Sequence, residues 1–523
     1  MHAWLGRVAW LCAVVSFAAT GCGDGLGEGP LGGAAGDEST AGPEVEVQGE
    51  FRMVVYDDFD SGRSWTELRV ELDDGEVAYR LEGLDPDSLP ESLAPGATIR
   101  VTGRLVDPES IRVDTRPGPD CPLVRGVEVL SPPMRAVSAS GVRNTLMIVA
   151  NFTDMAVRCT NAMIDATMFG ATDSVDGLYR EMTFGKVGFN GTVVGPFTIN
   201  VKSTSACDGM GWASKAENAA KQAGIRTTSY DHIVTVLPPA PGCGYSGIAN
   251  LVGSRAVVLA CSISPTYAHE LGHNLGMHHA NTDTIEYGDR SDVMGYTEKA
   301  LLQVNAPHKV QMGWIASSQV MQVSSSGVFE LAPLELDPAS AGGLPQILYF
   351  RNADSNENYF LSYRQRLGYD APMALPYVGG ASLHRHSGSG PTVVLSRFED
   401  GMVWEDPVSQ VAITQLSHDA SGVTVQVEFI PDTQPPSDPQ GLRITTSKQG
   451  NKYKANLVWT ASSDDVGVTG YDVARNGTVI ASSASVSFTD ANVSKGTAYT
   501  YAVRAKDAAG NLSGWSSPVT VVP

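Results

Sequence analysis

The stretch from His269 to His279 constrains this chain more than any other part of it. It places histidines at 269, 273 and 279, a glutamate at 270 and a glycine at 276. Residues four apart project from one face of a helix, so His269 and His273 can hold a small cation between their imidazoles. Glu270, directly after the first histidine, is then placed to act on a water beside that cation.

Gly276 and His279 extend the pattern beyond the helix. Glycine takes a positive φ at little cost, so the chain can turn sharply and bring His279 round as a third ligand. Three protein ligands leave a fourth coordination position open, which is typical of a catalytic zinc and not of a structural one. The sequence therefore predicts Zn²⁺ bound by His269, His273 and His279, with Glu270 as the general base.

This HExxHxxGxxH pattern resembles that of the metzincin metalloproteases, in which a downstream methionine turn forms a hydrophobic floor under the zinc. Met294, within 292–296, stands at a matching distance. Three further stretches are similar to the signature of the gametolysin-like peptidases: 287–289, 305–309 and 312–314. The similarity extends more weakly over about residues 140 to 430. The resemblance implies a zinc-dependent endopeptidase with a metzincin-type α/β protease domain.

The resemblance also suggests two supporting residues. In some metzincin branches a tyrosine two residues after the methionine stabilises the oxyanion, and Tyr296 has that spacing; ordinary packing explains it equally well. Some metzincins are kept inactive by a pro-segment cysteine whose thiolate takes the open zinc position. Cys121, in a loop-like stretch before the protease domain, is the candidate for this switch, and an unpaired or differently paired cysteine is an equally good explanation.

The N-terminus has the features of an export signal. Residues 1–21 combine one early basic residue with an apolar stretch too short to span a bilayer stably. Cys22 ends a sequence similar to a bacterial lipobox, which predicts lipidation and membrane attachment; cleavage without lipidation is the alternative. Residues 22–44 are rich in glycine and are expected to form a flexible tether. The protein is therefore expected outside the cell or in a bacterial cell envelope.

Cysteine usage fits an exported protein. Of the seven cysteines, four lie in the predicted catalytic region and can form two disulfides, as an oxidising compartment favours. The sequence does not fix how they pair. These four are Cys159, Cys207, Cys243 and Cys261.

Residue patterns divide the rest of the chain. Alternating apolar residues over 45–118 predict a small β-barrel or β-sandwich, either a pro-segment or an accessory module. The protease domain is expected at 140–315 and a β-rich extension at 316–430. After a proline-rich linker at 431–439, residues 440–523 resemble a fibronectin type III module, with Trp459 as its core tryptophan. The expected fold class is multidomain α+β: a metzincin-type α/β protease domain flanked by an N-terminal small β domain, the extension and a C-terminal β-sandwich.

Charge limits the partners. A net charge of −21 over 523 residues argues against nucleic acid or an anionic membrane surface, because both require a basic face. A protein or peptide substrate is the expected partner, and the C-terminal module either binds a surface partner or acts as a spacer. The function predicted is that of a secreted or surface-anchored zinc metalloendopeptidase. Two alternatives stay open: a catalytically silent adhesion or scaffold protein, and a zinc amidase acting on cell-wall peptide.

Overall fold

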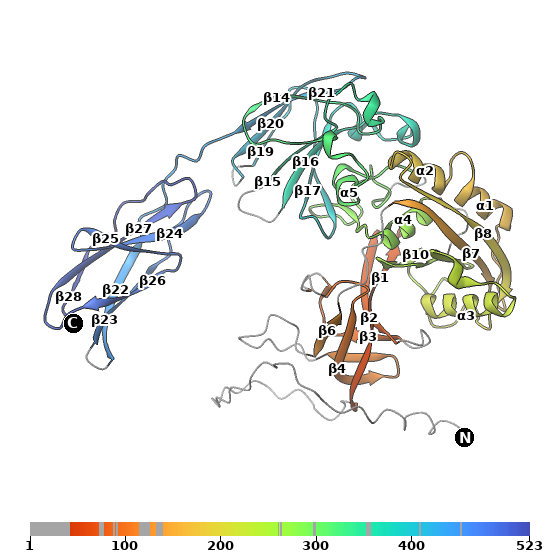
Figure 1. Ribbon diagram of the computed structural model, residues 1–523, viewed down its shortest axis with the longest axis horizontal. Coiled ribbons are helices and arrows are strands. Elements are labelled where there is room, and N and C mark those ends of the chain that lie inside the picture. Colours follow the sequence, from red (N-terminus) through yellow and green to blue (C-terminus); the bar gives the residue numbers. More distant parts are fainter. Residues whose placement is uncertain are drawn as a thin grey trace. The chain divides into compact units, whose positions relative to one another are not determined.

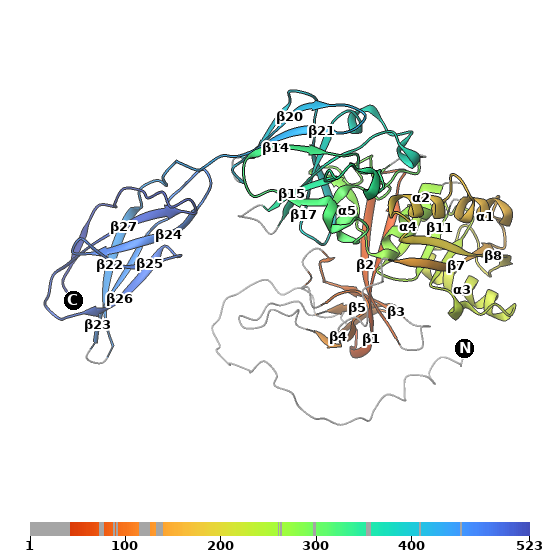
Figure 2. The same ribbon diagram turned by 45° about the horizontal axis from the view of Figure 1, so that its top comes forward.

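A computed structural model describes residues 42–72, 78–86, 89, 93–113, 126–131, 140–259, 261, 264–296, 300–351, 357–406, 409–449 and 452–523. The predicted signal segment 1–21, the lipidation residue Cys22, most of the tether 22–44 and the candidate switch Cys121 lie outside these residues. Contacts divide the chain into two units (Figures 1 and 2). The first comprises Met1–Tyr56, Trp65–Val137 and Asn250–Gly253, and the second comprises Asp57–Ser64, Ser138–Ala249 and Ser254–Pro523.

The first unit is built from a closed barrel. Its strands follow the order β1-β2-β3-β5-β4, and β4 pairs back onto β1, with β6 beside β4. β3 and β5 run parallel, and β4 is antiparallel to β1 and β5. This is the strand order of an OB-fold barrel. The strands are β1 (Glu44–Asp58), β2 (Arg63–Glu71), β3 (Ala78–Glu82), β4 (Thr98–Asp107), β5 (Ser110–Val113) and β6 (Val127–Ser131).

Alternation of apolar and polar residues explains why these segments form a barrel. In β2, β4 and the first part of β1 buried side chains alternate with less buried ones, because successive side chains in a strand point to opposite faces. Residues 53–57 at the end of β1 are all buried. The inward side chains form one apolar core, which includes Phe51, Val70, Ile99, Val101 and Ile111. The described strands of this part of the chain close into a barrel, whereas the sequence left barrel and sandwich open.

The second unit begins with a largely parallel sheet. The strands β11, β9, β7 and β8 are parallel neighbours, and β10 pairs antiparallel with β11. The central residues of β7, 146–150, are all buried, as expected for a parallel strand covered on both faces. The strands are β7 (Gly141–Asn151), β8 (Val187–Thr198), β9 (His232–Val236), β10 (Gly247–Leu251) and β11 (Arg255–Val258).

Helices cover both faces of this sheet. Figures 1 and 2 show α1 (Asn161–Phe169) and α2 (Val175–Met182) on one side and α3 (Gly209–Gln222) on the other. The helix that carries the histidine motif, α4 (Ser264–Leu275), packs on the side of α2: the Tyr179 hydroxyl of α2 donates to the Ala268 carbonyl of α4 at 2.8 Å. Every residue of α4 from Pro265 onward is buried. The motif is therefore held rigidly from all sides.

The β-rich extension consists of two sheets, and all of their strands except β12 follow α5 (Ala306–Gln311). One has the order β12-β18-β17-β16-β15-β13 and the other β14-β21-β20-β19, with an apolar core that includes Leu331, Leu361, Ile413 and Val425. The strands are β12 (Ala280–Thr282), β13 (Val320–Gln322), β14 (Gly327–Leu331), β15 (Ile347–Arg351), β16 (Asn358–Tyr363), β17 (Ala381–His386), β18 (Thr392–Arg397), β19 (Val403–Asp406), β20 (Val411–His418) and β21 (Val423–Phe429). Because β12 directly follows His279 and pairs with β18, the extension is continuous with the segment that carries the histidine motif.

The C-terminal module has a three-stranded sheet, β22-β23-β26, and a four-stranded sheet, β25-β24-β27-β28. Trp459, Tyr471 and Tyr501 are buried in its apolar core, where a β-sandwich places its large side chains. The strands are β22 (Gln440–Gln449), β23 (Lys452–Thr460), β24 (Val468–Arg475), β25 (Thr478–Ser483), β26 (Ser487–Val493), β27 (Tyr499–Asp507) and β28 (Val519–Val521).

The predicted fold class is wrong. The described residues are mostly β: they contain five α-helices, of six to fourteen residues, against twenty-eight strands. Four of these helices, α1 to α4, surround the parallel sheet, and α5 packs against β16 and β17 of the extension. The described residues of the barrel and of the C-terminal module contain no α-helix. Among the described residues, no helix is long and apolar enough to cross a bilayer.

The four candidate cysteines form two disulfides. Cys159 is bonded to Cys261, which immediately precedes α4, and Cys207 is bonded to Cys243. The first bond joins residues 102 apart and the second joins residues 36 apart. The longer loop loses more conformational entropy in the unfolded chain, so the first bond is expected to stabilise the fold more strongly.

We expect the double variant C159S/C261S to lose about 4–5 kcal/mol of unfolding free energy, and C207S/C243S about 1 kcal/mol less than that. Denaturant unfolding of the full chain under non-reducing conditions measures both. Equal stability of wild type and C159S/C261S would show that the first bond does not restrain the start of α4.

Candidate metal centre

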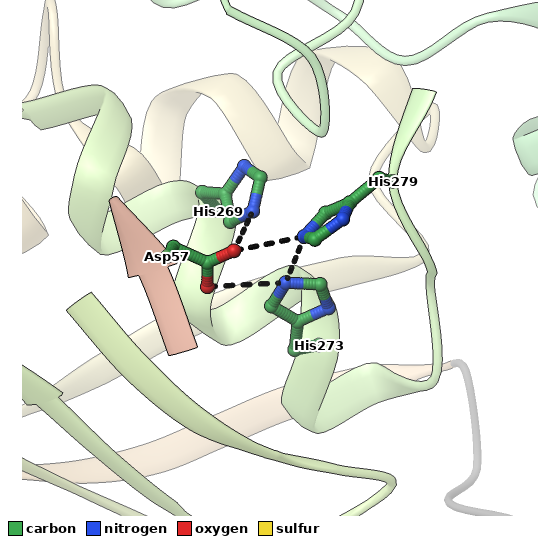
Figure 3. Close-up of side chains that lie close together, drawn as sticks. All are labelled: Asp57, His269, His273 and His279. Carbon is green, nitrogen blue, oxygen red and sulfur yellow. Dashed lines mark hydrogen bonds and ion pairs between the residues drawn. The ribbon is translucent and has the colours of Figure 1, made fainter. Parts of the chain in front are cut away.

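Three imidazoles converge at the end of α4. His269 and His273 project from one face of the helix, and His279 follows from the segment after Gly276 (Figure 3). Gly276 has a φ of +106°, a conformation that favours glycine, and this allows the chain to turn back. The Nε2 atoms of His273 and His279 are 3.1 Å apart. The three side chains are at most 8% exposed.

The other ring nitrogen of each histidine is engaged elsewhere. Since a carbonyl oxygen can only accept, two of the rings carry their proton on Nδ1 and present the Nε2 lone pair to the common point. The acceptors of Nδ1 are the Val293 carbonyl for His269 at 2.9 Å, the Met277 carbonyl for His273 at 2.8 Å and the Glu286 carboxylate for His279 at 3.1 Å. The Nε2 atoms of the three predicted ligands therefore face the common point, as they do in histidines that bind a metal through Nε2.

Glu270 lies beside this point and is completely buried. Burial raises the pKa of its carboxyl well above the ordinary value, and the nearby Asp57 carboxylate raises it further. A Cβ placed on Gly247 of β10 would come within 1.8 Å of Glu270 Oε1. The glutamate carboxyl therefore occupies space that exists only because residue 247 has no side chain.

Met294 lies beneath the histidines. It is fully buried, and a Cβ on Gly272 of α4 would meet its sulfur at 2.3 Å. Gly272 therefore allows the methionine turn to approach the helix between the two histidines. Met294 is the residue that the resemblance to the metzincins predicted as the hydrophobic floor under the metal.

The fourth side chain at this point is one that the sequence did not indicate. Asp57, near the end of β1, is fully buried, and its Oδ1 lies 2.8 Å from Nε2 of His279 and 3.6 Å from Nε2 of His269. Its Oδ2 lies 3.5 Å from Nε2 of His273. Figure 3 shows the carboxylate among the three rings. Burial alone would raise the pKa of Asp57, but the three imidazoles hold it well below its usual range.

The nearest tyrosine is Tyr287, not the predicted Tyr296. The Tyr287 hydroxyl donates to Asp57 Oδ1 at 2.5 Å, and its ring centroid is 4.3 Å from that of His279. Tyr296 is half-buried, with its ring 5.7 Å from the Arg290 guanidinium carbon. Spacing after the methionine could not have indicated Tyr287, because this residue precedes Met294 in the chain; it has a positive φ of 56°.

A buried polar network supports the loop that carries Tyr287 and Met294. Asp289 Oδ2 accepts from the Asn305 amide at 3.2 Å and lies 3.0 Å from His384 Nε2. Asp292 Oδ1 accepts from the backbone N–H of Met294 at 2.7 Å. Asp292 Oδ2 lies 2.8 Å from His308 Nδ1. The stretches 287–289 and 305–309, singled out in the sequence, thus support the site from below.

The extension contributes to the same network through Arg364 on the chain after β16. Its guanidinium donates to the Ser291 carbonyl at 2.7 Å and to the Gln303 carbonyl at 3.2 Å, and it pairs with Asp370. A charged group this deeply buried must be paired and hydrogen-bonded on all sides. Nothing in the sequence indicated that His384 or Arg364 would support the site.

The donor set fits a zinc ion. His269 Nε2 and both carboxylate oxygens of Glu270 are buried without a hydrogen-bond partner. Asp57 and the three histidines offer four donor atoms that all lie within 4.8 Å of one another. Buried imidazole nitrogens that converge on one point can share a cation, and nitrogen and carboxylate donors suit zinc.

Comparison with known proteins points to one class for this region. Residues 145–391 match the family model described as gametolysin peptidase M11. The match supports a metallopeptidase, and it covers α4, the methionine turn and the extension as far as the residue before β18.

Curated relatives match shorter parts of the chain. An α-amylase of Niallia circulans is 44% identical over 18% of this chain and 7% of the amylase. Exoglucanase B of Cellulomonas fimi is 47% identical over 17% of this chain and 8% of the exoglucanase. Autolysin of Chlamydomonas reinhardtii is 41% identical over 16% of this chain and 14% of its own. The chain thus spans less than a tenth of the length of the first two relatives. A solved Fn3-like protein from Clostridium thermocellum is 32% identical to this chain. The match covers 17% of this chain and 92% of the solved one, with a TM-score of 0.15.

We expect Asp289→Asn to destabilise the fold by about 3–5 kcal/mol at pH 7, because it removes one partner of a buried pair. Burial alone would raise the pKa of Asp289, but hydrogen bonding to His384 and the charge of that ring hold it far below its ordinary value. A carboxyl with a depressed folded-state pKa stabilises the fold above its unfolded pKa of about 4, and this stabilisation is lost as the pH falls further.

The stability of D289N should therefore depend less on pH below about 4 than that of wild type. Denaturant midpoints across that range measure the difference. Asp283→Asn is the matched control, since Asp283 is exposed and pairs with Arg385 at the surface; it should change stability by at most about 1 kcal/mol. Parallel pH profiles for D289N and wild type would contradict the expectation.

Proposed function

We propose that this chain is a zinc-dependent endopeptidase that hydrolyses peptide bonds of extracellular proteins. The observation that carries the proposal is the convergence of three buried imidazole Nε2 atoms beside the buried carboxyl of Glu270. The match of residues 145–391 to the gametolysin peptidase M11 family supports it. Intact ligands and an intact glutamate argue against a silent scaffold protein.

The residues of the site have separate tasks in this reaction. His269, His273 and His279 would hold the zinc, and Met294 would provide the apolar floor beneath it. Zinc supplies a Lewis acid that polarises the scissile carbonyl and makes water acidic enough to ionise near neutral pH. Glu270 accepts a proton from the attacking water and delivers it to the leaving amine nitrogen, so that one water is consumed as the C–N bond breaks.

Tyr287 is a stronger candidate than Tyr296 for stabilising charge on the substrate. Its hydroxyl already donates to a carboxylate oxygen at the centre of the site, where the oxyanion of a tetrahedral intermediate would develop. A donor fixed at this position is more useful in the transition state than in the ground state.

The remaining modules suggest where the enzyme works. The names of the matching relatives include chitinases, exoglucanases and an autolysin, and we propose that this chain is likewise exported. The C-terminal module would be a fibronectin type III domain that acts as a spacer or binds a surface partner. Cys22 would attach the chain to the envelope through a lipid.

We expect Glu270→Gln to lower kcat/KM by about 10²–10⁴-fold while zinc stays bound, because it removes the proton carrier but none of the ligands. In the intact chain the Asp57 carboxylate lies among the histidines and would occupy the metal site. Peptide hydrolysis is therefore measured on the intact chain and again after limited digestion with immobilised trypsin, which can cut at the exposed Arg63. Glu217→Gln, on α3 and paired with Arg255, is the matched control and should behave as wild type. Undiminished hydrolysis in E270Q would remove Glu270 as the base.

Removal of the metal should abolish hydrolysis, and added Zn²⁺ should restore it. Metal analysis is expected to give about one zinc per chain, and His273→Ala should bind it far more weakly, since two protein nitrogens cannot replace three. Casein and muropeptides offered side by side distinguish an endopeptidase from a cell-wall amidase. A preparation that contains no zinc, or that cleaves only muropeptides, would contradict the proposed function.

A further inference from the structure

The segment from Asp57 to Ser64 belongs to the second unit, although both of its ends continue into strands of the barrel. It is the link between β1 and β2. Its first residue reaches the three histidines, and its last, Ser64, donates from its backbone N–H to Glu286 Oε2 at 3.1 Å. The Ser64 hydroxyl also bonds to Glu286, the residue that orients His279. The segment therefore contacts the metal centre at both ends.

Asp57 is fixed at its position by contacts on every side. Its carbonyl oxygen accepts from the Ser246 backbone N–H at 2.6 Å, just before β10 begins. Its carboxylate accepts from the Tyr287 hydroxyl. Next to it, the ring of Phe59 packs edge-on against His269, with 4.9 Å between centroids, and 5.6 Å from Tyr287. A carboxylate that is completely buried, and that faces three imidazoles, is placed there by the fold and not by chance.

The position of the carboxylate has a chemical consequence. A zinc held by three histidines catalyses hydrolysis only through its open fourth position, whereas a zinc with four protein ligands is closed. Asp57 supplies a fourth donor at the point shared by the three Nε2 atoms. Its carboxylate also uses the Tyr287 hydroxyl, which a substrate oxyanion would otherwise use. Water and substrate are therefore both excluded.

We propose that Asp57 is a fourth, inhibitory metal ligand, and that the segment 57–64 keeps the chain latent until it is withdrawn. The inference rests on the proposed function and adds to it a regulatory role for the barrel domain. The barrel supplies the segment as its β1–β2 loop, a loop that OB-folds use for binding. Residues 60–63 of this loop are all exposed, and Arg63 is among them, so a protease can cut the segment without entering the site.

The first test compares peptide hydrolysis by the full-length wild-type chain with that of Asp57→Ala. We expect D57A to be at least tenfold faster without any proteolytic treatment, and the double variant D57A/E270Q to be inactive. Asp60→Ala is the matched control: this carboxylate is in the same segment but exposed, and D60A should stay as slow as wild type. Cleavage at Arg63 by immobilised trypsin should raise wild-type activity and leave D57A unchanged.

The second test does not depend on activity. Acetohydroxamic acid is a small ligand that needs open positions on the metal, and its binding to the Co²⁺-substituted chain is followed by visible absorption. Wild type should resist the probe, and D57A should bind it at least tenfold more tightly, with equal metal content in both chains. If D57A does not fold, Asp57→Asn keeps the shape of the side chain but weakens the ligand, and it should change in the same direction.

The outcomes separate the two proposals. Tighter hydroxamate binding by D57A without hydrolysis by any variant would support the inhibitory ligand and contradict the endopeptidase. Equal hydrolysis by wild type and D57A, abolished in both by E270Q, would support the endopeptidase and overturn the inhibitory role of Asp57. Equal hydroxamate binding by the two chains would also overturn that role.

Discussion

The structure around the metal centre depends on one requirement: three imidazoles must present Nε2 to the same point. A free imidazole ring rotates about its side-chain bonds, so its direction has to be fixed by a hydrogen bond at the other nitrogen. Two of these bonds go to backbone carbonyls, of Val293 and Met277, and therefore depend on the course of the chain after α4. The methionine turn is thus more than an apolar floor, because its backbone sets the direction of His269.

The same requirement explains why the β-rich extension takes part in the candidate metal centre. The described residues of 286–305 form no helix or strand, and their buried polar groups must be satisfied from outside. His384 from β17 and Arg364 after β16 provide this by bonding to Asp289 and to the Ser291 carbonyl. The family match continues through these strands, which agrees with a site whose support lies partly in the extension. A truncation after α5 would leave Asp289 without its histidine partner.

The barrel domain gains a physical role from one of its loops. A five-stranded barrel holds both ends of its β1–β2 loop, so the loop has a defined conformation. Ordering it therefore costs less conformational entropy than ordering a free peptide would. Within the second unit, this segment brings a carboxylate, an aromatic ring and a hydroxyl to the histidines and to Glu286. The thiol of Cys121 was the sequence-based candidate for an inhibitory ligand, and it lies outside the described residues.

The sequence by itself determined the local part of the site. Helical periodicity places His269 and His273 on one face, and the positive φ available to Gly276 returns His279 to them, because these relations extend over only eleven residues. It also indicated the strands of the barrel through alternation, and the C-terminal module through its resemblance to a fibronectin type III module. It could not determine the mostly β character of the whole, the choice of Tyr287 over Tyr296, or the place of Asp57, which is 222 residues from His279. Those depend on which distant segments pack together, and packing over such separations leaves no periodic pattern in the chain.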